Sequence, residues 1–290
     1  MYNILTLNKI SKSGLSHFPA GEFECSEAFE NPDAVIVRSA SMHDMELPAN
    51  LLAIARAGAG YNNIPVERCS ENGIVVFNSP GANAVAVKEL ELCSLVMSSR
   101  DVLGSIDWVK SIANCGDEIP ALVEKGKSSF EGPELLGKTL GVIGLGATGA
   151  LIANLAIDLG MTVYGYDPFM SVDAAWILSR EIIHAETLED IYRNSDYISL
   201  NVPYNDKTRH MLNAEAFDKM KVGVRIINES RAEVVDDEAM TDALDKGKVA
   251  RYVTDFPNKD ILKAPNVIAM PHLGACTPES EVRCAVMAAK

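Results

Sequence analysis

The sequence contains no uninterrupted apolar run long enough to cross a bilayer. In each apolar stretch an Asp, Lys, Asn or Gly occurs before the roughly 20 residues that a membrane helix needs. The first residues also lack the basic and then apolar regions of a secretory signal. We therefore expect a cytoplasmic protein with no membrane partner.

Basic residues are scarce, with 26 Lys and Arg against 40 Asp and Glu and a net charge of −14. This balance argues against nucleic acid or anionic lipid as a partner. An acidic protein that binds an anion must place a few basic side chains locally, so single arginines are informative. The six cysteines form no C-x-x-C pair and no metal-like spacing, so we expect reduced cysteines and no metal site.

At 290 residues the chain is long enough for two domains. No short-period repeat or low-complexity tract is present. The first part predicts strands at 2–8, 23–25, 34–38, 51–56 and 73–77 and a helix at 65–72. This alternation is typical of a small α/β domain with a parallel sheet.

A different pattern follows, with a long helix expected over 84–113 and a surface loop over 114–137. Alternation then resumes, with strands expected at 140–143, 161–166, 197–202, 224–228, 251–256 and 266–270. The helices between them are expected at 147–159, 187–194, 213–220 and 236–246. A last helix begins at Thr277 with no stop signal before Lys290, as expected where a chain has been cut or its remainder is absent.

The chain is organised around a glycine turn between the strand at 140–143 and the helix at 147–159. Gly144, Gly146 and Gly149 have the spacing G-x-G-x-x-G. The first glycine suits a tight turn, the second lets the backbone approach a pyrophosphate, and the third lets helix and strand pack closely. The N-terminus of the following helix favours a bound phosphate. We therefore predict a dinucleotide site, the alternative being a glycine-rich crossover in another α/β sheet.

Asp167 stands at the end of the next strand, at about the distance at which a ribose-binding acid is expected. A carboxylate there accepts hydrogen bonds from both adenosine ribose hydroxyls and repels a 2′-phosphate. The coenzyme is therefore expected to be NAD rather than NADP.

Three polar groups follow later strands of the same domain, at the edge where open α/β sheets bind ligands. These are Arg231, Asp260 and His272. Oxidation of a 2-hydroxy acid needs a two-pronged donor for the carboxylate, a base for the hydroxyl proton and an acid that orients this base. Each residue also has an alternative reading when it is taken singly. Arg231 could be a surface arginine, Asp260 an acid at a helix start, and His272 a loop histidine.

The segments 164–168, 227–231, 252–257 and 271–275 resemble those of the D-isomer-specific 2-hydroxyacid dehydrogenases. The resemblance implies an α/β protein of two parallel-sheet domains. A Rossmann-type NAD domain, residues 84–275, is expected to be inserted into a smaller flavodoxin-like substrate domain, residues 1–83 and 276–290. It also implies a homodimer formed through the coenzyme domain and the long helix.

The same resemblance assigns the site residues. Arg231, Asp260 and His272 are implied as the catalytic set. The residues implied to hold the substrate are Arg38, Ser39, Ala57, Gly58, Ala59, Gly60 and Asn83. Those expected to bind NAD are Gly144, Gly146, Ala147, Thr148, Gly149, Asp167, Val202, Pro203, Thr208, Asn228 and Asp255. The acid departs from the family pattern, because Asp260 stands where the family has glutamate, one methylene longer.

The segments 37–39, 55–65 and 78–83 point to one activity within the family. They imply NAD-dependent oxidation of D-3-phosphoglycerate to 3-phosphohydroxypyruvate, the first step of the phosphorylated route to serine. Reduction of hydroxypyruvate, glyoxylate or pyruvate is the related alternative, and an NAD(H)-sensing binding protein is an alternative of another class. A second phosphate-binding cation beyond Arg38 would favour the phosphorylated substrate; Lys9 is a candidate, and the alternative for Lys9 is a solvated turn lysine.

Overall fold

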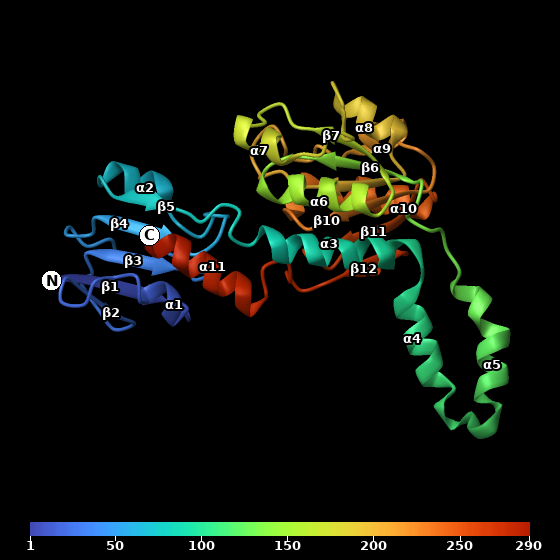
Figure 1. The fold of residues 1–290 in the computed structure, drawn as a ribbon, viewed down its shortest axis with the longest axis horizontal. Coiled ribbons are helices and arrows are strands. Elements are labelled where there is room, and N and C mark those ends of the chain that lie inside the picture. The colour runs from blue at the N-terminus through green and yellow to red at the C-terminus, as the bar shows by residue number, and fades with distance from the viewer. The chain divides into compact units, whose positions relative to one another are not determined.

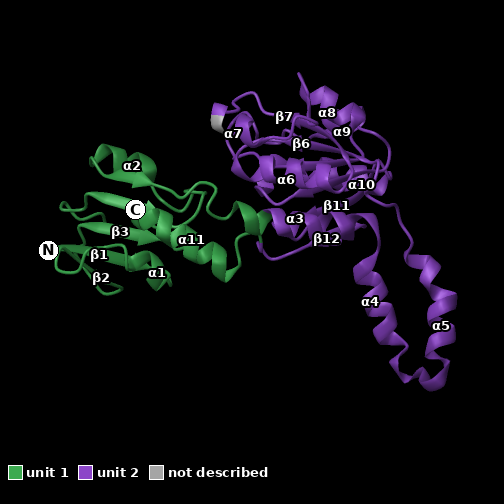
Figure 2. Cartoon of the chain, in the orientation of Figure 1, with its two compact units in different colours: residues 1–87, 274–290 green, residues 88–273 purple. Residues whose placement is uncertain are grey.

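The computed structural model describes residues 1–172 and 174–290. The chain forms two compact units, one of residues 1–87 and 274–290 and one of residues 88–273 (Figure 2). We call them unit 1 and unit 2. Their boundaries fall within a few residues of the expected domain boundaries at 83 and 276.

Unit 1 contains a five-stranded parallel sheet in the order β2-β1-β3-β4-β5 (Figure 1). This order is that of flavodoxin-like folds. The strands are β1 (Tyr2–Leu7), β2 (Phe23–Ser26), β3 (Ala34–Val37), β4 (Ala53–Arg56) and β5 (Val75–Phe77). Its helices are α1 (Lys12–Leu15), α2 (Val66–Glu71) and α11 (Pro278–Ala289).

Helix α11 comes from the end of the sequence and packs against α1. A Cβ on Gly14 would lie 2.5 Å from the Ala285 carbonyl carbon, so the two helices touch where Gly14 has no side chain. Buried Cys284 and Ala285 join the same apolar cluster as Ile4 and Ile36 of the sheet. Residues from both ends of the sequence therefore share one core.

Unit 2 contains a seven-stranded parallel sheet in the order β12-β11-β10-β9-β6-β7-β8. Strands β7 and β8 are added on one side of β6, and β9 to β12 are added on the other side. The strand order therefore changes direction between β6 and β9, as in a dinucleotide-binding fold. The strands are β6 (Thr139–Ile143), β7 (Thr162–Tyr166), β8 (Ile183–His184), β9 (Tyr197–Leu200), β10 (Val224–Asn228), β11 (Val249–Thr254) and β12 (Val267–Ala269). The expected α/β class with a Rossmann-type domain is confirmed.

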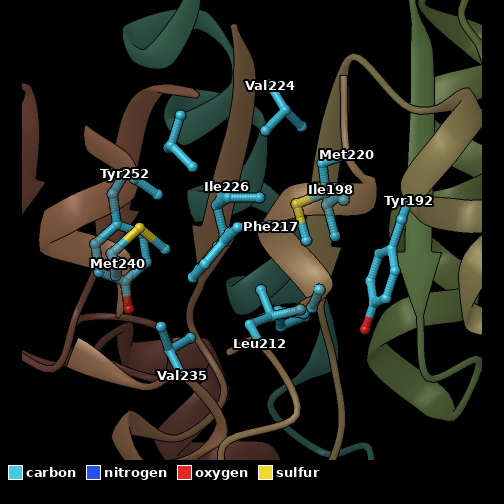
Figure 3. Close-up of a cluster of buried hydrophobic side chains, with 14 of the residues drawn as sticks. Tyr192, Ile198, Leu212, Phe217, Met220, Val224, Ile226, Val235, Met240 and Tyr252 are labelled. Atoms are coloured by element: carbon cyan, nitrogen blue, oxygen red, sulfur yellow. The ribbon is translucent and has the colours of Figure 1, made fainter. Parts of the chain in front are cut away.

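Helices cover both faces of this sheet because its strands are apolar on both sides. In β10, Ile226 faces one buried cluster and Ile227 the other. The first cluster is closed by α8 (Leu188–Asn194), α9 (Ala214–Lys219) and α10 (Asp237–Asp245), with Phe217 and Met240 drawn in Figure 3. The second is closed by α3 (Ala84–Ser99) and α6 (Ala147–Asp158). Helix α8 starts at a capping box formed by Thr187 and Asp190, as its Thr-x-x-Asp sequence predicts.

Two expected segments differ in the structure. The helix expected over 84–113 is divided into α3 and α4 (Val102–Ser111), because the Asp101 carboxylate accepts from the Gly104 N–H at 3.2 Å and caps a new helix. The loop expected over 114–137 instead contains α5 (Ile119–Gly126), flanked by 3₁₀ turns at Ala113–Glu118 and Lys127–Phe130. The Trp108 and Phe130 rings, 5.5 Å apart, pack the resulting helical hairpin.

Three short elements were not expected from the sequence: α1, α7 (Val172–Ile177) and β8. Two 3₁₀ turns complete the unit 2 elements, at Ala232–Val234 and Ile261–Lys263. Both 3₁₀ turns follow strands whose ends carry predicted site residues.

Candidate active site

The turn after β6 lets α6 start directly at the edge of the sheet. Gly144 adopts φ 90° and its N–H donates to the Tyr166 carbonyl at 2.8 Å. A Cβ on Gly149 would overlap the Gly144 carbonyl oxygen, whereas a Cβ on Gly146 would meet nothing within 4 Å. Gly149 is therefore required for packing, and Gly146 leaves open space in front of the helix.

The N-terminus of α6 fits the pyrophosphate of a dinucleotide. The helix begins after Gly146 with no side-chain cap and no acidic residue in its first turn. Gly146 and Ala147 are exposed, and Thr148 is half-buried. The unpaired backbone N–H groups of the first turn and the helix dipole therefore face the open space that Gly146 leaves.

Asp167 is fixed at the end of β7 by two backbone groups. One carboxylate oxygen accepts from the Leu145 N–H and the other from the Phe169 N–H, each at 2.8 Å. Each carboxylate oxygen can accept about two hydrogen bonds, so each oxygen of Asp167 can accept one more, from a ribose hydroxyl. The residue is thus ordered for the role that the sequence predicts.

The loop after β9 lies beside the same turn. Val202 is a neighbour of Gly144, since a Cβ on that glycine would lie 3.0 Å from its Cγ1. The Thr208 hydroxyl donates to the Pro203 carbonyl at 2.7 Å and so closes this loop. The structure therefore brings Val202, Pro203 and Thr208 together with the glycine turn.

Asn228 shapes the loop that carries Arg231. Its amide nitrogen donates to the Arg231 carbonyl at 2.9 Å and to the Tyr252 hydroxyl at 3.3 Å, and its oxygen accepts from the Ser230 hydroxyl at 2.9 Å. Both amide hydrogens are thus used inside the protein, and contact of Asn228 with the coenzyme stays a prediction. The half-buried Arg231 guanidinium donates to the Ser230 carbonyl at 2.5 Å.

His272 follows β12 in a backbone conformation that side chains resist. It has φ 40°, its N–H donates to the Asp255 carbonyl at 2.9 Å, and its ring centroid lies 4.8 Å from that of Phe256. Such left-handed residues gather at functional sites, where surrounding contacts hold them. Because β10, β11 and β12 are parallel neighbours, Arg231, Asp255 and His272 all leave the sheet at the same edge.

Asp260 is an exposed residue of the expected catalytic set. Its side chain is 64% exposed and lies 3.9 Å from the Lys263 ammonium. Its backbone N–H donates to the Asn258 side chain at 3.0 Å, which fixes the start of the 3₁₀ turn. Cooperation of Asp260 with His272 stays a prediction.

Two acids at this edge, one buried and one half-buried, were missed by the sequence analysis. Glu91 in α3 is 2% exposed, and Glu229, directly after β10, receives a hydrogen bond from the Ser94 hydroxyl at 2.5 Å. The signal for Glu91 was its position between Leu90 and Leu92 in an apolar helix. These acids are considered further below.

A cationic pocket lies at the carboxyl end of the unit 1 sheet. Lys9, Arg38 and Arg56 line it together with Gly58 and Asn83. A Cβ on Gly58, which has φ 151°, would overlap the guanidinium of Arg56, so the glycine makes room for the arginine. Arg38 also pairs with Glu281 of α11 at 2.6 Å. The pocket can therefore bind an anion that several cations share.

The predicted substrate residues fall only partly in this pocket. Its lining includes Arg38, Ala57, Gly58 and Asn83. Among the described residues, Ser39, Ala59 and Gly60 are not part of the lining. The Ser39 N–H donates instead to the Asn8 side chain at 2.9 Å. Arg56 was not predicted as a site residue, and its place at the end of β4 is the signal that could have marked it.

Two absences concern the described part of the chain. No three His, Cys, Asp or Glu side chains in it are grouped to hold a metal ion. None of its helices combines the length and apolar character that crossing a bilayer requires. The cytoplasmic location expected from the sequence stays a prediction.

Comparison with known proteins places the chain in a family. A sequence model described as "D-isomer specific 2-hydroxyacid dehydrogenase, NAD binding domain" matches residues 102–274. A hydroxypyruvate reductase of Thermotoga maritima is 36% identical over 266 residues, which are 88% of this chain and 81% of that protein. The chain belongs to the D-isomer specific 2-hydroxyacid dehydrogenase family. Its second unit is the NAD-binding domain of that family, and the expected coenzyme is confirmed.

Other relatives are longer than this chain. A D-3-phosphoglycerate dehydrogenase of Bacillus subtilis is 31% identical over 303 residues, covering 98% of this chain and 55% of its own length. The chain thus spans about half the length of this relative. An NAD⁺-bound 3-phosphoglycerate dehydrogenase structure from Entamoeba histolytica has TM-score 0.78 and 24% identity, covers 99% of this chain and 93% of its own, and shares the fold.

The two glycines of the turn give a matched pair of predictions. Gly146→Ala is expected to weaken NADH binding roughly tenfold or more, because the methyl group enters the space of the pyrophosphate, while thermal stability stays unchanged. Gly149→Ala is expected to lower stability by about 1–3 kcal/mol, because its methyl group overlaps the Gly144 carbonyl. Fluorescence titration and thermal unfolding measure the two effects. A Gly149→Ala variant as stable as the natural protein would contradict the assigned packing role.

Proposed function

We propose that the chain is an NAD-dependent dehydrogenase that oxidises D-3-phosphoglycerate to 3-phosphohydroxypyruvate. The observation that carries this substrate is the unit 1 pocket, in which Arg56 and Lys9 join Arg38. A phosphorylated hydroxy acid has a second anionic group in addition to its carboxylate, and a cluster of cations suits a phosphate. The names of several relatives, D-3-phosphoglycerate dehydrogenases 31–33% identical to this chain, support the same choice.

The proposed chemistry divides between the side chains of unit 2. Arg231 binds the substrate carboxylate, and its charge polarises the C2 oxygen as the carbonyl forms. The His272 imidazole takes the proton of the C2 hydroxyl. Asp260 orients His272, either directly after a small loop shift or through water. Bound NAD supplies the hydride acceptor, held by the glycine turn, Asp167 and the loop after β9.

Reduction of hydroxypyruvate is the second candidate. A Thermotoga maritima hydroxypyruvate reductase, 36% identical to this chain over 266 residues, supports this candidate. This activity needs the same Arg231 and His272 but no phosphate site. The two candidates therefore differ in what Arg56 does.

The reverse reaction tests the substrate. We expect NADH oxidation to be more efficient with 3-phosphohydroxypyruvate than with hydroxypyruvate, glyoxylate or pyruvate. Arg56→Gln is expected to raise KM for the phosphorylated acid about 10–100-fold, since a charged hydrogen bond contributes ~1.5–3 kcal/mol, with under about threefold change for hydroxypyruvate. Lys12→Gln, an exposed cation outside the pocket lining, is the control. Equal effects on both acids would favour the second candidate, and inactivity with every acid despite tight NADH binding would favour an NAD(H) sensor.

The role of His272 has its own test. His272→Ala is expected to lower kcat roughly 10²–10⁴-fold, because no other group replaces the base. NADH affinity should stay within about twofold, since the base acts on the substrate hydroxyl rather than on the coenzyme. His17→Ala, an exposed histidine of unit 1, is the control. Turnover equal to that of the natural protein would remove His272 from the mechanism.

We also propose that two copies of the chain associate through α4. No residue of this helix is buried in the described chain, and Leu103, Ile106 and Val109, each 44–47% exposed, lie at successive spacings of three. Apolar side chains in such a row suit a second copy. Ile106→Glu is expected to give a monomer in light scattering, while Lys110→Glu on the same helix leaves the dimer. A monomeric natural protein would contradict the proposal.

A further inference from the structure

Three acids lie near one another at the carboxyl end of the unit 2 sheet; Glu91 and Asp255 are buried, and Glu229 is half-buried with one buried carboxylate oxygen. Asn228 and Thr254 are the last register partners of β10 and β11, so Glu229 and Asp255 are the next residues of two adjacent strands. Glu91 approaches from α3, where it is 2% exposed, and Asp255 is 1% exposed. These carboxyl groups come from distant parts of the sequence, and the fold brings them close enough for their charges to act on one another.

Serine hydroxyls hold the two glutamates. Ser94 donates to one oxygen of Glu229 at 2.5 Å, and the Ser199 hydroxyl of β9 hydrogen-bonds to Glu91. Glu91 and Ser94 are three residues apart, so they share one face of α3. Oε1 of Glu91 and Oε2 of Glu229 are buried without a hydrogen-bond partner. We call Glu91 and Glu229 the carboxyl pair.

Burial and mutual repulsion favour the protonated form of this pair. Loss of hydration, and then the charge of Asp255, raise the pKa of Glu229 to about 7, while the Ser94 hydrogen bond opposes the rise. Loss of hydration and the charge of Glu229 raise the pKa of Glu91 well above its usual value. Glu229 therefore changes its charge near neutral pH, and Glu91 stays protonated to a higher pH than an ordinary glutamate.

Other titratable groups lie on the elements around the pair. Tyr252 of β11 stays neutral, because burial raises the pKa of its hydroxyl to about 12. Arg231 lies in the same loop as Glu229, and its guanidinium donates to a backbone carbonyl. Asp255 and His272 follow the next two strands, joined by a backbone hydrogen bond of 2.9 Å. The pair thus lies among the residues to which the proposed function assigns the reaction.

We propose that the carboxyl pair is a proton-binding site coupled to the oxidation state of the bound nicotinamide. The inference rests on the proposed function, which places the nicotinamide at this edge of the sheet. The oxidised ring carries a positive charge, which ionised carboxylates attract, and the reduced ring is neutral. Glu229 is therefore a positioning residue for the coenzyme's charge and does not touch the hydroxyl that reacts.

The proton balance is simple. When hydride from C2 of the substrate reduces the ring, the ring loses its positive charge and the pair takes one proton from solvent, forming one O–H bond. When NADH leaves and NAD⁺ binds, the pair returns that proton to solvent. The proton of the substrate hydroxyl goes separately to His272. No other reactant is needed.

This coupling predicts that the two coenzyme forms differ in pH dependence. As pH rises through about 7 the pair ionises, so NAD⁺ binds more tightly and NADH does not. The ratio of the NADH to the NAD⁺ dissociation constant is expected to rise about tenfold between pH 6 and pH 8.5, since one proton is linked to the charge of the ring. In Glu229→Gln, which cannot ionise, the ratio should stay flat.

Titrations of both coenzyme forms across this range test the proposal. Glu89→Gln, an exposed glutamate two residues from Glu91 on the same helix, should behave like the natural protein. Ser94→Ala removes the hydrogen bond that lowers the pKa of Glu229, so the change in ratio should move to higher pH. Repeating the series with His272→Ala removes the imidazole as a source of the effect. A ratio that is constant in the natural protein, or that still varies in Glu229→Gln, overturns the coupling.

A second measurement separates this inference from the proposed function. Carboxyl carbon NMR of the coenzyme-free protein should show a glutamate titrating near pH 7 that disappears in Glu229→Gln. If that signal is present but neither coenzyme form binds at any pH, the proposed function fails. If both forms bind with identical pH dependence, the coupling alone fails. If no glutamate titrates near neutral pH, the proton site itself is disproved.

Discussion

The contact between Gly149 and the carbonyl oxygen of Gly144 is the constraint on which unit 2 depends. Without a side chain at Gly149, α6 can begin at the end of β6 rather than at a distance from it. The same turn brings the Leu145 N–H to Asp167 and places Val202 beside Gly144. The coenzyme site is therefore a consequence of one close backbone approach, around which polar groups are ordered.

Acidic side chains gather further along the same edge of the sheet, after β10 and β11. Parallel strands end at one edge, so β10 and β11 deliver Glu229 and Asp255 to neighbouring positions. Helix α3 adds Glu91, which is 2% exposed, to the same edge. Removing three carboxyl groups from water costs free energy unless protons or partners neutralise them. The proposed proton exchange follows from that cost.

The sequence predicts those parts of the fold that local rules control. The G-x-G-x-x-G spacing, the strand before it and the Thr187 capping box all depend on residues within a few positions, and each appears where expected. The division between α3 and α4 was missed because Asp101 was not considered as a cap within a continuous helical pattern. The hairpin helix α5 was missed because charge, Pro and Gly in that segment resembled a loop.

The site is predictable only in part, for a related reason. Arg231 and His272 are marked by strand ends, whereas the surroundings of Glu91 include Ser199 and Glu229, which come from distant parts of the chain. The anion-binding role proposed for Arg56 depends on Lys9 and Arg38, which line the same pocket. The space that its guanidinium fills exists only while residue 58 is a glycine. Two independent constraints therefore keep a glycine at position 58: the Arg56 guanidinium fills the space that a Cβ would need, and the φ of 151° is one that residues with a side chain rarely adopt, so replacing Arg56 alone would not free the position.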